Sequence, residues 1–219
     1  MGADESSQMK ENLAKSCGQT KADFDKCVTA VNHLIDCVEE YLPGRKFVKL
    51  SLQQLASIRD NCYIIIERVN EIKNYLKEKE YQVQHLMGTE LFNKLMNPDT
   101  RFQDKIDMAL KAVTVIKTIA VTVGSIILVT VISGGNVLAP VVATLGVIAT
   151  STVAVLALFL IGGLIATIIL AIINLIGRQN LNKVVAELKQ GVDAFQPASD
   201  AFYASVCEVR VMIQFDIKS

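Results

Sequence analysis

The feature that most constrains this chain is a long stretch without charge. The 60 residues from Thr118 to Gly177 contain no Asp, Glu, Lys, Arg or His, so all 22 basic and 22 acidic residues lie in the flanks. About 20 apolar helical residues cross the hydrocarbon core of a bilayer, and the stretch is therefore long enough for two or three crossings. The alternative is a buried central helix in a soluble domain, which would need an apolar partner surface that the polar flanks barely supply. The sequence therefore predicts an integral membrane protein.

The predicted transmembrane segment, residues 118–177, reads as a helical hairpin. Its turn is expected at residues 133–136 (Ser-Gly-Gly-Asn), because these residue types disfavour a continuing helix. The stronger span is Val153–Ile176, which is uncharged and rich in Leu, Ile and Val. Small residues on one face of this span are predicted to let membrane helices pack closely, namely Gly162, Gly163 and Ala166.

The positive charges beside the segment favour an even number of crossings. The basic residues compared are Arg101, Lys105 and Lys111 before the segment and Arg178, Lys183 and Lys189 after it. Equal counts place both flanks on the cytosolic side, since Lys and Arg mark that side. The five cysteines form no CxxC pair, which fits reduced thiols in the same compartment. A single pass remains the alternative.

The region 1–98 is predicted to hold two helices separated by Pro43-Gly44. The second helix is expected to begin at Ser51 and to end before Gly88. It carries apolar residues at both core positions of successive heptads: Leu55, Ile58, Cys62, Ile65, Val69, Ile72 and Leu76. The short connection around Pro43-Gly44 predicts that the second helix folds back antiparallel on the first, and the seam predicts that the two helices pack together.

The remaining segments complete an all-α fold class, with helical hairpin and coiled-coil flanks around a long apolar membrane segment. Residues 99–117 are predicted to be an amphipathic helix that leads into the uncharged segment. Residues 178–219 form a second coiled-coil-like region, with apolar residues at sevens from Leu181 onward. Pro197 is expected to kink or break this helix, with Ser199 recapping the chain.

Two short stretches carry a family resemblance. They are Asn-Cys-Tyr-Ile-Ile-Ile-Glu at residues 61–67 and Glu-Leu-Phe-Asn-Lys-Leu at residues 90–95. Together with the layout of helices around an apolar segment, they resemble the single-pass membrane and coiled-coil domain-containing protein family, most closely over residues 55–95. The resemblance implies an integral membrane protein with coiled coils and brings no catalytic residues. The 60 uncharged residues are longer than the single pass in the family's name.

No catalytic, metal-binding or cofactor-binding residue is predicted. His33 and His85 lie on separate predicted helices, whereas a metal site needs several ligands at short spacing. A formal net charge of zero gives no general attraction to nucleic acid, and no site for a small-molecule substrate is evident. Gly2 lies in Met-Gly-Ala-Asp-Glu-Ser, which matches the minimal pattern for lipidation by myristate. A solvated amino terminus is the alternative interpretation.

These features favour a non-enzymatic integral membrane protein whose coiled-coil flanks serve assembly or partner binding. The expected partners are the lipid bilayer and either a second copy of the chain or another coiled-coil protein. The alternative function is membrane permeabilisation, in which a soluble helical bundle hides an apolar hairpin and inserts it when triggered. Residues 118–152 fit this alternative, because they mix apolar residues with several Ser and Thr.

Overall fold

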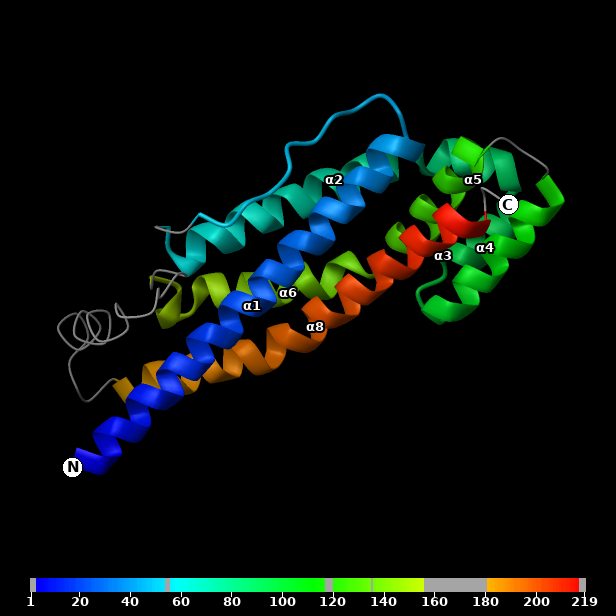
Figure 1. Ribbon diagram of the computed structural model, residues 1–219. Coiled ribbons are helices and arrows are strands. Elements are labelled where there is room, and N and C mark those ends of the chain that lie inside the picture. The colour runs from blue at the N-terminus through cyan, green and yellow to red at the C-terminus, as the bar shows by residue number, and fades with distance from the viewer. Residues whose placement is uncertain (1–2, 54–55, 117–119, 135, 156–180, 217–219) are drawn as a thin grey trace.

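The structure is a computed structural model that describes residues 3–53, 56–116, 120–134, 136–155 and 181–216. Within these ranges all regular structure is helical and no β-strand occurs, which confirms the all-α class. Long helices lie side by side along one axis, and short helices gather at one end of this bundle (Figure 1). The elements are α1 (Ala3–Tyr41), α2 (Ile58–Met87), α3 (Thr89–Met96), α4 (Phe102–Ile116), α5 (Ala120–Ile127), the π-helix η1 (Leu128–Ser133), α6 (Leu138–Thr150), the 3-10 helix η2 (Thr152–Val155) and α8 (Leu181–Asp216).

The main partner of α1 is α8, the last helix of the chain. The rings of Phe24 and Phe195 lie 5.2 Å apart, and Arg210 Nη1 lies 2.6 Å from His33 Nδ1 further along both helices. The residue numbers of the contacting pairs increase together along the two helices, so α1 and α8 run parallel. The apolar residues that recur every seven positions in α8 lie on the side that packs against α1, and they are buried from Leu188 through Val209. The coiled-coil-like apolar stripes of the two flanks thus pack against each other within one chain.

The segment between α1 and α2 is an extended strap rather than a tight turn. It runs back along α1, where Glu39 Oε1 accepts a hydrogen bond from Phe47 N at 2.7 Å. Asn32 pairs with both backbone groups of Leu50, since its Oδ1 accepts from Leu50 N at 2.8 Å and its Nδ2 donates to Leu50 O at 2.9 Å. The strap thus carries the chain back along α1, from its end at Tyr41 to Asn32 and beyond. For this reason α2 runs parallel to α1, and the predicted antiparallel hairpin is not formed (Figure 1).

The start of α2 differs from the predicted Ser51 cap. The helix begins at Ile58, where Ser57 Oγ accepts a hydrogen bond from Asp60 N at 3.1 Å and Asp60 Oδ2 accepts one from Ser57 N at 3.2 Å. This reciprocal pair is a capping box, which satisfies two otherwise unpaired amide groups. Ser51 instead belongs to the strap, because the strap's hydrogen bonds to α1 hold that part of the chain extended.

The helix α8 continues through Pro197 without the predicted break. Ser199 does not recap the chain, since its buried hydroxyl donates to the backbone oxygen of Asp23 on α1 at 3.0 Å. Pro197 lies on the exposed side of α8. The carbonyl that its ring leaves unpaired one turn earlier can therefore bond to water, which lowers the usual cost of proline inside a helix.

Candidate functional site in the uncharged segment

The first half of the uncharged segment lies inside the bundle. Every residue from Ile126 to Ile132 is buried, and none is more than 1% exposed. A helix that is apolar around its whole circumference is either buried in protein or embedded in lipid. Here α2, α3, α4, α5 and α8 contact η1. The described flanks therefore do supply the apolar partner surface that their sequence appeared to lack.

The predicted turn at residues 133–136 is the point where the buried helix bends. Val123–Ser133 and Leu138–Thr150 meet at 46°. A π-helix precedes the bend, and Thr130 Oγ1 donates to Ile126 O at 2.5 Å within it. Asn136 has a φ of 53°, in the left-handed region that ends a helix.

Neighbouring backbone and side-chain atoms of the same chain approach Gly134 so closely that the bend requires glycine at this position. A Cβ atom at this position would lie 2.6 Å from Thr130 O and 2.8 Å from Met96 Sδ. One of these neighbours is backbone and cannot move aside cheaply, so only glycine fits the packed bend.

Lys105 of α4 caps the end of the buried helix. Its side chain is fully buried, and Nζ donates to the carbonyl oxygen of Gly134. A cation near a helix carboxyl terminus interacts favourably with the unpaired carbonyl groups there. Burial lowers the pKa of Lys105, because the charged amine is removed from water. Sequence reasoning missed this role, although Lys105 follows the apolar-face residue Phe102 by one helical turn.

Three further polar contacts hold the uncharged helices to the bundle. Ser125 Oγ donates to Tyr41 O of α1 at 2.6 Å. Ser133 Oγ donates to Glu80 Oε1 of α2 at 3.0 Å. At the far end of α6, Arg59 Nε donates to Ala149 O at 3.1 Å. These contacts fix α5, η1 and α6 along their length, with α6 antiparallel to α2.

The predicted seam of α2 is buried, and α1 is not the main partner of this helix. Ile58, Cys62, Ile65, Val69, Ile72 and Leu76 are all at most 3% exposed, and Leu55 lies outside the described residues. The helix α2 packs mainly along α6 and η1, with less contact to α1 than predicted. The physical reason is that the uncharged helices need a covering surface, and the α2 seam provides it.

The cysteines of this region behave as apolar core residues. Burial raises the pKa of the Cys27 and Cys62 thiols to about 12, so both stay protonated at neutral pH. Among the described residues, no three His, Cys, Asp or Glu side chains gather in a group that could hold a metal ion. The described core offers no activated nucleophile at these two positions.

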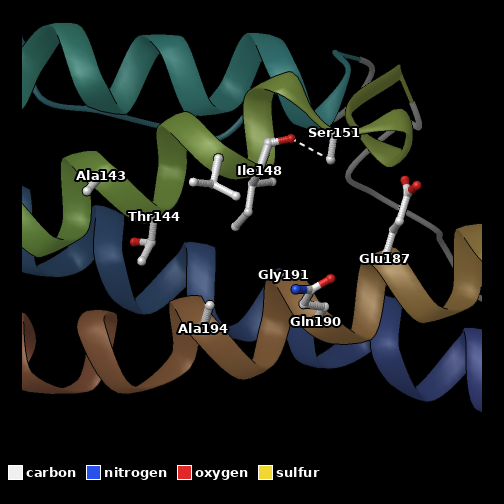
Figure 2. A pocket seen from close by; sticks show the side chains of 9 residues that line it. Ala143, Thr144, Ile148, Ser151, Glu187, Gln190, Gly191 and Ala194 are labelled. Atoms are coloured by element: carbon white, nitrogen blue, oxygen red, sulfur yellow. Dashed lines mark hydrogen bonds between the residues drawn. The ribbon is translucent and has the colours of Figure 1, made fainter.

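A groove lies beside α6, between it and α8. Figure 2 shows its walls, formed by Ala143, Thr144 and Ile148 of α6 and by Gly191 and Ala194 of α8. Its volume is about 280 Å³. Ser151, Glu187 and Gln190 also contribute to the lining, with Ser151 and Glu187 toward one end (Figure 2). The groove is therefore largely apolar, with its charged group at an end.

The two chain ends that border residues 156–180 lie together. Val153 of η2 and Leu188 of α8 line one small cavity along with Thr20 of α1. Figure 1 shows η2 and the start of α8 at the same end of the bundle. The described residues on either side of residues 156–180 therefore lie at the same end of the bundle.

Residues 9–161 match the family described as a protein of unknown function, DUF4533. The chain belongs to this family. The part shared with the DUF4533 family runs from within α1 through η2 and so includes the bend, its lysine cap and α6. No solved structure matches the chain.

Several predicted membrane features fall outside what the structure describes. No single described helix is long and apolar enough to cross a membrane, and only the bent pair Val123–Ser133 with Leu138–Thr150 reaches that length and composition. The predicted span Val153–Ile176 lies outside the described residues except for its first three. The predicted packing residues Gly162, Gly163 and Ala166 and the lipidation position Gly2 also lie outside them.

Proposed function

We propose that this protein is a non-enzymatic membrane protein whose helical flanks form one bundle and whose residues 156–177 attach it to the bilayer. The observation that carries the proposal is the division of the uncharged segment. Residues 123–132 and the inner face of α6 find apolar partners inside the bundle, where most of their side chains are buried. Residues 156–177 are 22 uncharged residues and are long enough, at about 33 Å of helix, to enter a bilayer core.

The packing of α8 on α1 supports a location of both flanks on one side of the membrane. The 25 residues between Val155 and Leu181 are too few for two full crossings, which need about 40. A single full crossing would place α8 across the bilayer from α1 and would expose both halves of their seam. Attachment that enters and leaves the same face keeps the seam buried, and both termini then lie in the cytosol.

Carbonate extraction with topology tags tests this proposal. Full-length protein expressed in mammalian cells is expected in the carbonate-resistant pellet. A glycosylation acceptor placed at either terminus in turn is expected to stay unmodified. The same acceptor on a known lumenal domain serves as the control for glycosylation. Recovery in the carbonate supernatant would refute membrane attachment, and modification of one terminus would show a full crossing with α8 separated from α1.

Conditional insertion of the buried hairpin is the second candidate function. The observation that favours it is the enclosure of the bent pair Val123–Ser133 and Leu138–Thr150 by helices that carry the charges. Contacts such as that of Lys105 with Gly134 would have to break before insertion. Purified protein added to dye-loaded vesicles should then cause leakage, and Gly134→Ala, which disturbs the bend, should lower the threshold for it. Vesicle binding without leakage in both proteins would count against permeabilisation.

A further inference from the structure

We propose that the groove between α6 and α8 binds one acyl chain of a membrane lipid. This inference rests on the proposed membrane attachment, because it takes the end of the bundle beside residues 156–177 to lie at the bilayer surface. The chemistry of the groove walls, the volume of the groove and its position all favour an acyl chain as the occupant.

The walls suit a hydrocarbon better than a polar ligand. Gly191 and Ala194 leave space on the α8 side, and Ile148 and Val147 supply apolar surface on the α6 side. The hydroxyl of Thr144 donates to its own helix at Pro140 O, 2.8 Å away, and is not available to a ligand as a donor.

The hydroxyl of Ser151, like that of Thr144, donates to a nearby backbone oxygen. It donates to Ile148 O at 2.7 Å, the bond drawn in Figure 2. Glu187, at that end, lies 3.8 Å from Lys183 Nζ and is a quarter exposed. The polar groups therefore leave the apolar walls free for a chain and lie where a headgroup or water would contact them.

The volume and position select a single chain. About 280 Å³ is just below the range of about 300–1,000 Å³ that drug-sized ligands fill, so a slender chain fits and a whole two-chain lipid does not. The end with Ser151 and Glu187 is formed by the last residue before η2 and by the second turn of α8. These are the elements that border residues 156–180. A lipid in the adjoining leaflet can therefore extend one chain into the groove without leaving the membrane.

Photo-crosslinking from the lipid tests the inference. Full-length protein is reconstituted in phosphatidylcholine vesicles in which one acyl chain ends in a diazirine, and adducts are mapped by mass spectrometry after irradiation. Adducts are expected on residues 138–151 and 187–194, in addition to residues 156–177. Ala143→Leu and Ala194→Leu enlarge exposed wall residues and should reduce the groove adducts about tenfold, since each leucine displaces roughly two chain methylenes.

The matched control is Ala201→Leu, one heptad further along the exposed side of α8 and away from the groove. It should leave all adducts unchanged, and thermal melts should show all three variants folded. Groove adducts that persist in Ala143→Leu and Ala194→Leu, or adducts confined to residues 156–177, would overturn the inference while leaving membrane attachment intact. Absence of adducts together with carbonate release would instead refute the proposed function.

Discussion

At the scale of single residues, Gly134 and Lys105 decide how the uncharged helix is held. Gly134 allows the backbone to bend against Thr130 O and Met96, and Lys105 pairs with the carbonyl that this bend presents. The burial of Lys105 also changes the charge argument made from sequence. That argument counted Lys105 as a surface charge beside the membrane, whereas the structure places it in the core. The balance of basic residues at the two borders is therefore less even than the sequence implied.

Gly134→Ala is expected to destabilise the protein by about 1–3 kcal/mol, because the new methyl group would overpack the bend. Thermal unfolding followed by circular dichroism in mild detergent measures the effect. Gly146→Ala is the matched control on α6, where a Cβ meets nothing within 4 Å. This control should be neutral or slightly stabilising, since alanine is the better helix former. Equal midpoints for the two variants would show that the bend is not packed as described.

The buried thiol of Cys62 should make stability fall with rising pH. Its pKa is raised to about 12 by burial, whereas the unfolded chain loses this proton near pH 9.0. Above that lower value the unfolded state binds fewer protons than the native state. The free energy of unfolding therefore decreases with pH, by up to about 1.4 kcal/mol per pH unit for each such thiol.

Cys62→Ala removes the contribution of this thiol to the decrease of the free energy of unfolding with pH. Its thermal midpoint should fall less steeply than that of the parent between about pH 8 and about pH 10, the range in which the unfolded thiol titrates. Ile65→Ala, one turn along the same seam, also removes buried side-chain volume but carries no titrating group, and should keep the parental slope. Parallel pH profiles for Cys62→Ala and the parent would contradict the burial of this thiol.

At the scale of elements, the partner of each helix follows from how the strap turns the chain. A short turn would have made α1 and α2 antiparallel neighbours along their seams. The strap instead uses polar side chains of α1 to hold the backbone around Phe47 and Leu50, and α2 starts only after the chain has run back along α1. The seam of α1 is thereby left for α8, and the seam of α2 for α6 and η1.

Asn32→Ala should release the strap. The substitution removes both hydrogen bonds to Leu50 and is expected to cost about 1–3 kcal/mol, because backbone groups at this half-buried site lose their partner. Trypsin cleavage at Arg45, Lys46 and Lys49 should become faster, as measured by the rate of fragment appearance. Asn74→Ala, on the exposed side of α2, is the control and should cleave at the parental rate. An unchanged rate for Asn32→Ala would mean that the strap is held by other contacts.

At the scale of the whole molecule, the described residues that border residues 156–180 lie at one end of the bundle. Val153 of η2 and Leu188 of α8 line one small cavity there. The first and last helices of the chain are packed together along their length. The folded unit and the proposed attachment segment are therefore separable in principle.

Replacement of residues 156–177 by a flexible Gly-Ser linker of about eight residues, which spans about 15 Å, tests this separation. The shortened protein should appear in the carbonate supernatant and still unfold cooperatively, because its apolar core is retained. The full-length protein is the control for both measurements. A shortened protein that stays in the carbonate pellet would assign membrane attachment to residues other than 156–177. Loss of cooperative unfolding would show that these residues belong to the core.

The sequence by itself determined the helical class, the separation of charged flanks from an uncharged segment, the break near residues 133–136 and the buried seam of α2. These features follow from local periodicity and residue type, which act within a few helical turns. Tertiary structure decided which seams meet, because several apolar stripes of similar spacing can pair with one another. It also decided that the first half of the uncharged segment lies among other helices, since hydrophobicity alone favours burial in protein and in lipid equally. Tertiary structure likewise decided the burial of Lys105, because only the folded arrangement brings the Gly134 carbonyl within reach of its amine.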